Sequence, residues 1–173
     1  MIEQDLDHEE TRKVVDLIID RTKELHDRGI SVEVLTVDNH ADGPYLYLRM
    51  LRENNPRAKK VLDLLKMNEG NSSGRGIGCV SWDGSVHADQ FWRHYSFGNV
   101  LERPFSEIWT DLSDPLMAKL KDKKKYVKGR CAECRWLDIC AGNFRVRPEA
   151  VSGDVWAEDP ACYLTDEEIG LRK

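Results

Sequence analysis

The spacing of apolar residues predicts a helix near the start of the chain, followed by a strand. The helical stripe consists of Val14, Val15, Ile18, Ile19, Thr22 and Leu25. Asp7 precedes the stripe as an N-cap, Glu10 completes a capping box, and Gly29 ends the helix. Residues 32–37 (VEVLTV) are β-branched and nearly all apolar, which predicts a buried strand. A helix, a glycine and a buried strand in this order are typical of a parallel α/β unit.

A polar loop, residues 38–43 (DNHADG), follows the predicted strand directly. Ligand sites in parallel α/β folds gather at the carboxyl ends of strands, so we expect His40 and Asp42 to contact a substrate. The alternative is that both side chains belong to a solvated loop. Further along, Pro44 and Pro56 are each expected to start a short helix.

Residues 68–76 (NEGNSSGRG) are rich in glycine, serine and asparagine, which predicts a linker or a domain boundary. The GxxxxGK[ST] pattern of a phosphate-binding loop is absent, so we exclude a phosphate site there. Residues 77–86 predict a hairpin, because Asp83-Gly84 is a two-residue turn signal between apolar runs.

The segment from Asp89 to Tyr95 is crowded with aromatic and polar side chains. Trp92, Arg93 and His94 together suit a planar, anionic ligand, and we expect them to contact one. The alternative is that the rings form the edge of an aromatic core.

Short helices and a basic run are predicted between the aromatic segment and the cysteines. Pro104 starts one short helix, and Ser113 caps the next. The lysines between positions 119 and 128 are expected to lie on a solvated helix face.

Composition narrows the class of protein. The chain has 173 residues, of which 40% are hydrophobic, enough for one ordinary domain or a small domain plus part of another. Its formal net charge of −5 disfavours a nucleic-acid-binding protein, because that class is usually basic. No stretch reaches the ~20 apolar residues of a membrane helix. The acidic start also lacks the apolar region of a signal peptide, so we expect a cytoplasmic protein with no membrane partner.

Four of the five cysteines lie in the last part of the sequence, namely Cys131, Cys134, Cys140 and Cys162. Four thiolates close around either one tetrahedral zinc ion or one [4Fe–4S] cluster. The pattern of three close cysteines and one distant cysteine favours the cluster, because zinc sites usually bring two pairs of ligands. Zinc and unligated redox thiols stay open as alternatives. Cys79 is expected to be a small buried hydrophobe in a strand.

Two arginines follow the local cysteines. Arg145 and Arg147 are two positions apart, so in a strand they would share a face and would suit a substrate carboxylate. The alternative is a pair of surface arginines.

The order of these motifs resembles the C-terminal region of radical SAM enzymes with a SPASM-type auxiliary cluster domain. The likeness covers residues 76–165: a cysteine hairpin from Cys79 to Gly84, a segment from Gly98 to Trp109, then Cys-x2-Cys-x5-Cys and a distant cysteine. Four sequence segments are similar to those of the tetrapyrrole-processing branch of this family, namely NHADG, NEGNSSG, DQFWRHYSFGNV and RCAECRWLDICAGNFRVR. This branch includes NirJ-like haem d1 biosynthesis proteins and 12,18-didecarboxysirohaem deacetylases.

The resemblance implies an α+β fold in two parts. Residues 1–70 would be the last α/β unit of a radical SAM barrel with its connector helices. Residues 71–173 would be a small SPASM- or twitch-like domain with a hairpin, short helices and a cysteine-rich loop. Asp89 and Phe144 stand where the two-cluster pattern has cysteines. One auxiliary [4Fe–4S] cluster is therefore expected, on the four late cysteines.

The Cys-x3-Cys-x2-Cys motif of the SAM-cleaving cluster is absent from this sequence. The resemblance then implies that SAM and a second [4Fe–4S] cluster belong to a missing N-terminal domain or subunit, and that this chain is inactive alone. The whole enzyme would remove side chains from an iron tetrapyrrole, 12,18-didecarboxysirohaem, in haem or haem d1 biosynthesis. A zinc-bound interaction module and a stand-alone electron-transfer domain that serves a separate radical SAM subunit remain the alternatives.

Overall fold

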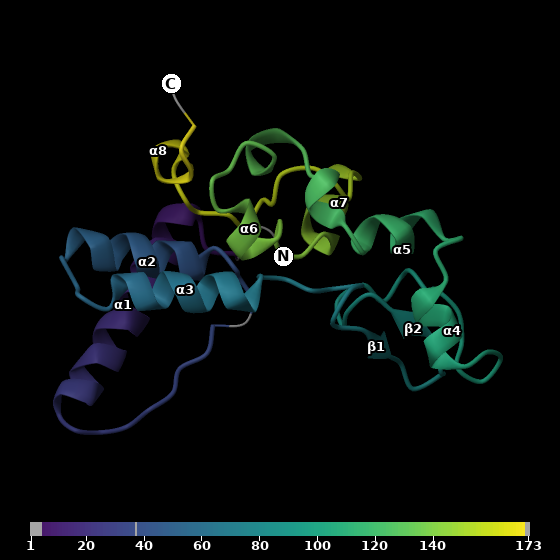
Figure 1. The fold of residues 1–173 in the computed structure, drawn as a ribbon, viewed down its shortest axis with the longest axis horizontal. Helices are drawn as coiled ribbons and strands as arrows, with labels where there is room; N and C mark the ends of the chain where they lie inside the picture. Colours follow the sequence, from purple (N-terminus) through teal and green to yellow (C-terminus); the bar gives the residue numbers. More distant parts are fainter. Residues whose placement is uncertain (1–4, 37, 172–173) are drawn as a thin grey trace.

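The structure is a computed structural model that describes residues 5–36 and 38–171, and it is mainly helical with a two-stranded sheet. Three helices come first: α1 (His8–Asp27), α2 (Asp42–Arg52) and α3 (Ala58–Asn68). The strands are β1 (Cys79–Val80) and β2 (Val86–His87), followed by α4 (Phe105–Thr110) and α5 (Pro115–Leu120). The remaining elements are η2 (Lys123–Lys125), η3 (Gly129–Cys131), α6 (Leu137–Cys140), α7 (Val146–Ser152) and α8 (Asp166–Ile169). The first three helices and the sheet with α4 lie towards opposite ends of the molecule, with the cysteine-rich segment above them (Figure 1).

The predicted first helix is confirmed, together with its cap. The Asp7 side chain accepts a hydrogen bond from the Glu10 backbone N–H, and the Glu10 side chain accepts one from the Asp7 backbone N–H. At the other end, Gly29 has a φ of 76°, a left-handed conformation that favours glycine. The helix therefore begins and ends where its local sequence predicts.

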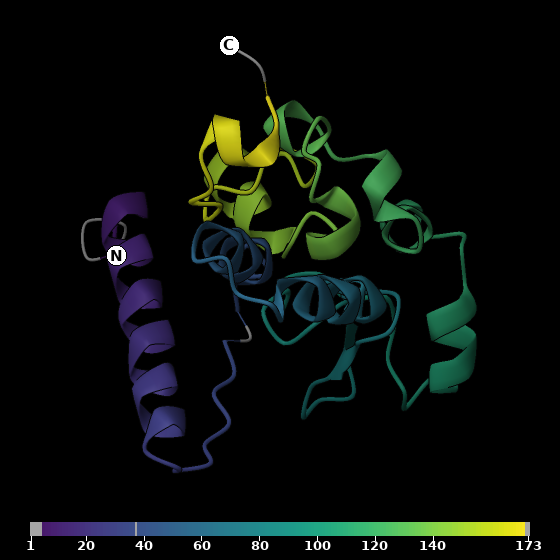
Figure 2. The same ribbon diagram turned by 60° about the vertical axis from the view of Figure 1, so that its left-hand side comes forward.

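The predicted buried strand at 32–37 is wrong for residues 32–36, and Val37 lies outside the described residues. Residues 32–36 are extended but form no strand, and Val34 and Leu35 are 47% and 73% exposed. Figure 2 shows this segment running beside α1 as an open connection to α2. A buried strand needs neighbouring strands on both sides, and the described part of the chain offers this segment none.

The hairpin prediction is confirmed. Strands β1 and β2 pair antiparallel, with Cys79 opposite His87 and Val80 opposite Val86. The Gly84 N–H bonds to the Ser81 carbonyl, and Gly84 has a φ of 87°. The Asp83-Gly84 signal therefore marks the turn, although the structure closes it with one residue more than the predicted pair.

The segment predicted as a linker is packed against the cysteine-rich part of the chain. Asn71 and Ser73 are 2% and 1% exposed, and the Asn71 N–H donates to the Cys140 carbonyl. Gly70 has a φ of 69°, and a Cβ there would lie 2.3 Å from the Ile139 carbonyl oxygen. Glycine at position 70 therefore allows this segment to pack closely against the backbone of Ile139 and Cys140.

Two predictions between the sheet and the cysteines need correction. The N-cap of α5 is Asp114, whose side chain accepts from the Leu116 and Met117 N–H groups, and not Ser113. Lys123 is only 5% exposed, so the lysine run is not wholly on a solvated face.

The main hydrophobic core lies beside the cysteine-rich segment. It joins α1, α2, α6 and α8 through Val15, Ala41, Tyr45, Trp136, Ile139, Tyr163, Leu164 and Ile169. A second core around Ala88, Trp92 and Leu120 supports the region of the sheet. Because the first core contains residues on both sides of position 70, the predicted division into 1–70 and 71–173 stays a prediction. Within the described residues, no helix has the length and apolar character needed to cross a membrane.

Candidate metal centre

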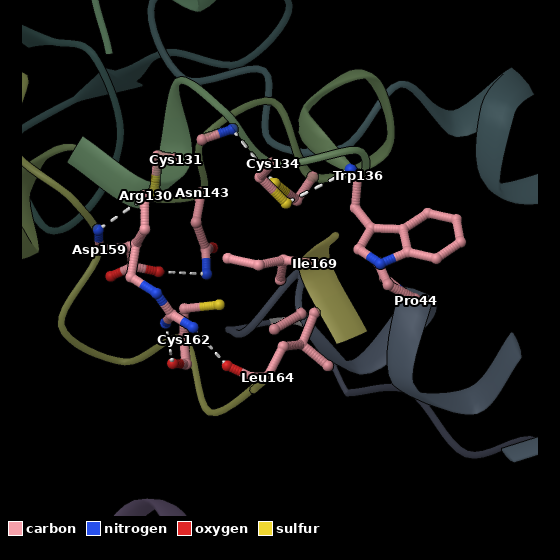
Figure 3. A pocket seen from close by; sticks show the side chains of 13 residues that line it. Pro44, Arg130, Cys131, Cys134, Trp136, Asn143, Asp159, Cys162, Leu164 and Ile169 are labelled. Atoms are coloured by element: carbon pink, nitrogen blue, oxygen red, sulfur yellow. Dashed lines mark hydrogen bonds between the residues drawn. The ribbon is translucent and has the colours of Figure 1, made fainter. Parts of the chain in front are cut away.

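The four late cysteines line one pocket, although they come from four different places in the local fold (Figure 3). Cys131 ends η3, Cys134 follows in a turn, Cys140 ends α6, and Cys162 lies just before α8. Apolar side chains of Pro44, Trp136, Leu164 and Ile169 line the same pocket. All five cysteines are free thiols, and Cys79 in β1 is not among the residues that line this pocket.

Backbone N–H groups point at all four sulfur atoms. The Trp136 N–H lies 3.3 Å from the Sγ of Cys134, and the Gly142 N–H lies 3.4 Å from the Sγ of Cys140. The Asp159 N–H is 3.4 Å from the Sγ of Cys131. At the last thiol, a hydrogen bond from the Leu164 backbone lowers the pKa of Cys162, but burial raises this pKa by more. In three of the four cases the donor is two residues after the cysteine, which is how a tight turn presents an N–H to a thiolate.

Burial favours the protonated form of three of the thiols. It raises the pKa of Cys140 to about 12 and that of Cys162 to about 11, and it also raises the pKa of Cys134. Thiolates bind metals, so loading of this pocket must release protons. The N–H groups described above would then stabilise the thiolate form.

A single metal ion and a cluster require different spacings of four thiols. In a tetrahedral zinc site with Zn–S bonds near 2.3 Å, the four sulfurs lie about 3.8 Å apart. Across residues 5–36 and 38–171, no three His, Cys, Asp or Glu side chains converge closely enough to hold one metal ion. A cubane needs wider spacing, because each thiolate binds a different iron atom.

Arg130 holds the distant cysteine beside the local three, and no sequence pattern signals this role. Its guanidinium donates to the Cys162 carbonyl at 3.2 Å, the Leu164 carbonyl at 2.6 Å and the Asp166 carboxylate at 3.1 Å. Figure 3 shows this side chain reaching across the pocket towards Cys162 and Leu164. The Trp136 indole N–H adds a bond of 2.8 Å to the carbonyl of Glu168 in α8.

Asn143 is a second residue of the site that no sequence pattern reveals. It is 3% exposed and lines the cysteine pocket. Its amide donates to Asp159 at 2.6 Å and to Asn39 at 2.9 Å, while its oxygen accepts from the His40 backbone N–H at 3.3 Å. A polar network therefore connects the cysteine pocket to the loop that carries His40.

His40 and Asp42 lie together in a larger groove, although Asp42 is the first residue of α2 rather than part of the predicted loop. Both line a groove between α1, α2, α3 and residues 70–73, which Phe144 also borders. The His40 ring lies 3.1 Å from the Asn143 amide oxygen, and burial lowers the pKa of His40. The Asp42 carboxylate accepts a bond of 2.6 Å from the Tyr163 hydroxyl, and burial raises the pKa of Asp42.

The two arginines do not share a face. Arg145 is the N-cap of α7 and Arg147 lies in its first turn, so the predicted strand geometry is wrong. Arg145 is 0% exposed and bonds to backbone carbonyls. Arg147 is partly exposed, lies over the Phe144 ring at 5.2 Å, and donates to the Asp38 carbonyl beside the groove.

The aromatic segment reaches the groove only at its start, where Gln90 lines it and the Phe91 ring lies 5.2 Å from that of Phe144. Trp92 is 1% exposed, and its indole N–H donates to Glu149 at 2.6 Å, which favours a packing role. His94 is exposed and lies 3.1 Å from the same carboxylate. Arg93 is exposed and lies over the Trp82 ring at 5.2 Å. Substrate contacts by these three residues stay a prediction.

Part of the cysteine-rich segment matches a known protein family. Residues 73–135 match the SPASM family, described as an iron–sulfur cluster-binding domain, and the match includes Cys131 and Cys134. No solved structure shows a significant match.

Two curated relatives match nearly the whole chain, and another matches a shorter part of it. The chain is 69% identical over 98% of its length to a protein of Methanosarcina barkeri named Fe-coproporphyrin III synthase. It is 43% identical over 96% of its length to a pre-heme d1 synthase of Dinoroseobacter shibae. An AdoMet-dependent heme synthase of Methanosarcina barkeri is 40% identical over 38% of the chain, which is 18% of that protein. The chain spans 43% and 42% of the first two proteins. The predicted resemblance is thus confirmed: residues 73–135 match the SPASM family, and the chain is similar to proteins named for Fe-coproporphyrin III, pre-heme d1 and AdoMet-dependent heme synthesis.

Proposed function

We propose that the chain binds one auxiliary [4Fe–4S] cluster through Cys131, Cys134, Cys140 and Cys162. The observation that carries the proposal is the pocket that the four thiols line, with a backbone N–H directed at each sulfur. Such donors stabilise thiolate charge and are a known means of setting cluster potential. The pattern of three close cysteines and one distant cysteine favours the cluster over the zinc alternative.

The cluster, when bound, would exchange one electron with a substrate or a second centre. The chain's own residues would shield this exchange from water. Trp136, Leu164 and Ile169 are all less than 10% exposed and cover the pocket with apolar surface. An apolar cover controls solvent access, and with it the potential of the site.

We further propose that the substrate is an iron tetrapyrrole, 12,18-didecarboxysirohaem. The names of the relatives support this class, and 69% identity against 43% favours the iron-coproporphyrin reaction over haem d1 synthesis. The groove that contains His40 and Asp42 is the best-placed binding region, because Phe144 offers an aromatic face there. Arg147 at its edge is partly exposed and suits a propionate or acetate side chain.

A radical SAM barrel, in the same protein or in a partner subunit, would supply SAM chemistry. The relatives whose names include AdoMet dependence support this part of the proposal. The stand-alone electron-transfer alternative differs only in placing the barrel on a separate chain.

Anaerobic reconstitution with iron and sulfide tests the cluster. We expect about four irons per chain, an absorbance band that dithionite bleaches, and an EPR signal in the reduced state. Cys162→Ala should lose these signals, while Cys79→Ala should keep them, because Cys79 lies outside the pocket. One zinc per chain with no iron would contradict the proposal.

Binding of 12,18-didecarboxysirohaem, followed by its Soret band, tests the groove. Arg147→Ala should weaken binding about tenfold, which corresponds to the loss of one charge-assisted hydrogen bond. Arg75→Ala is the matched control, because Arg75 forms an exposed ion pair with Glu69 on the surface. Equal affinities in the two variants would remove Arg147 from the site.

A further inference from the structure

Two cationic side chains are buried next to the cysteine pocket without an acidic partner. Arg145 is 0% exposed and Lys123 is 5% exposed. Within residues 5–36 and 38–171, neither side chain has a carboxylate oxygen within 4.0 Å of its nitrogen atoms. Buried cations of this kind are rare, since lysine and arginine are almost never fully buried unless paired.

Arg145 is held by the backbone that presents two of the cysteines. Its guanidinium donates to the Ala157 carbonyl at 2.6 Å and also to the Gly142 carbonyl. Gly142 is the residue whose N–H points at Cys140, and Asp159, two residues after Ala157, directs its N–H at Cys131. The Nε of Arg145 is buried and has no hydrogen-bond partner among the described residues.

Lys123 approaches the same region from η2. Its ammonium group donates to the Asn71 side-chain oxygen and, at 3.4 Å, to the Asn143 carbonyl. Both asparagine backbones donate to the Cys140 carbonyl, at 3.2 Å and 3.0 Å. Lys123 therefore joins the glycine-rich segment to the cysteine loop through neutral oxygens only.

Retention of both charges is costly in the metal-free chain. Burial, together with the nearby positive charge of Arg145, lowers the pKa of Lys123 to about 7. Burial also lowers the pKa of Arg145, while negative charge at Cys131, Asp159 or Cys140 would raise it. The other groups that affect the pKa of Lys123 are Cys140, Arg75 and Asp89, and none of them forms an ion pair with it. Two like charges in a low-dielectric region require a nearby anion.

We propose that Arg145 and Lys123 are the built-in counter-charges of the anionic cluster, and that they raise its reduction potential. The inference rests on the proposed cluster-binding function. A four-thiolate cubane is net negative and gains a further negative charge on one-electron reduction. Fixed positive charges beside it stabilise the reduced state more than the oxidised state. Both residues are positioning residues, since they act on the cluster through space and through the backbone rather than as ligands.

An EPR-monitored redox titration of the reconstituted chain tests the proposal. In Lys123→Met, the equilibrium constant for one-electron reduction should fall at least tenfold, a shift of about 59 mV to more negative potential. Lys125→Met is the matched control, because Lys125 lies in the same short helix but is 74% exposed and paired with Asp122. Arg145→Met should shift the potential in the same direction, while Arg145→Lys keeps the charge and should restore most of the wild-type potential.

The outcomes separate this inference from the function on which it rests. A wild-type chain that takes up no iron defeats the cluster proposal itself. A wild-type chain that holds a cluster, with equal potentials in Lys123→Met and Lys125→Met, overturns the role of the buried cations. If Arg145→Met fails to fold, the lysine pair alone decides the question, because methionine matches the length and apolar stem of lysine.

Discussion

Gly70→Ala is the sharpest test of the packing that surrounds the cysteines. Gly70 has a φ of 69°, so any L-residue there costs about 1–2 kcal/mol for the left-handed conformation alone. The new Cβ would also lie 2.3 Å from the Ile139 oxygen and 2.5 Å from the carbonyl carbon of Cys140. Both are backbone atoms, so no side-chain rotation relieves the contact, and overpacking adds about 1–3 kcal/mol.

The expected total is therefore about 2–5 kcal/mol of lost unfolding free energy, measured by urea denaturation under anaerobic conditions. Gly29→Ala is the matched control, because Gly29 has a φ of 76° but a Cβ added there would meet nothing within 4 Å. It should lose only the strain of about 1–2 kcal/mol. Because the displaced carbonyl belongs to a predicted ligand, Gly70→Ala should also bind less iron on reconstitution, whereas Gly29→Ala should not. Equal destabilisation by the two substitutions would refute the close-packing argument.

Two further predictions follow from side chains near the C-terminal segment. Arg130→Ala should destabilise the chain by about 2–4 kcal/mol, because three hydrogen bonds that hold the Cys162 segment disappear. The variant should also lose iron to a chelator faster, and an unchanged rate of iron loss would contradict this role. The Arg12 guanidinium lowers the pKa of Glu168 from 4.5 to about 2, so this pair contributes stability above pH 4.5 that is lost as the pH falls towards 2. In Glu168→Gln, thermal unfolding between pH 6 and pH 3 should lose about 1–2 kcal/mol of this pH dependence, and an unchanged pH profile would exclude the pair as its source.

The features that the sequence predicts well are local ones. The capping box at Asp7, the turn at Gly84 and the four-cysteine set depend on residues close together in the chain or on a distinctive spacing. Apolar content predicts a strand at 32–36, but a strand also needs partners that the described residues do not include.

Other parts of the site depend on contacts between distant segments. The bonds from Arg130 to the Cys162 segment and from Lys123 to Asn71 join residues far apart in the chain, with no local pattern to announce them. A shared face for Arg145 and Arg147 requires a strand, and the helix α7 separates them instead. Burial of a cation is a tertiary property, and composition alone places such residues on the surface.

Cys140 and Cys162 are far enough apart in the chain that a shared cluster would constrain the segment between them. A cluster that bonds both residues is a covalent cross-link, and it closes a loop of the chain in the way that a disulfide does. The chain-entropy relation for a loop between positions 140 and 162 gives about 3–4 kcal/mol of stabilisation. Iron supply would then be a folding variable for the last part of the chain. Without the cluster this segment would lack the cross-link, and limited proteolysis should cleave it more readily than in the loaded chain.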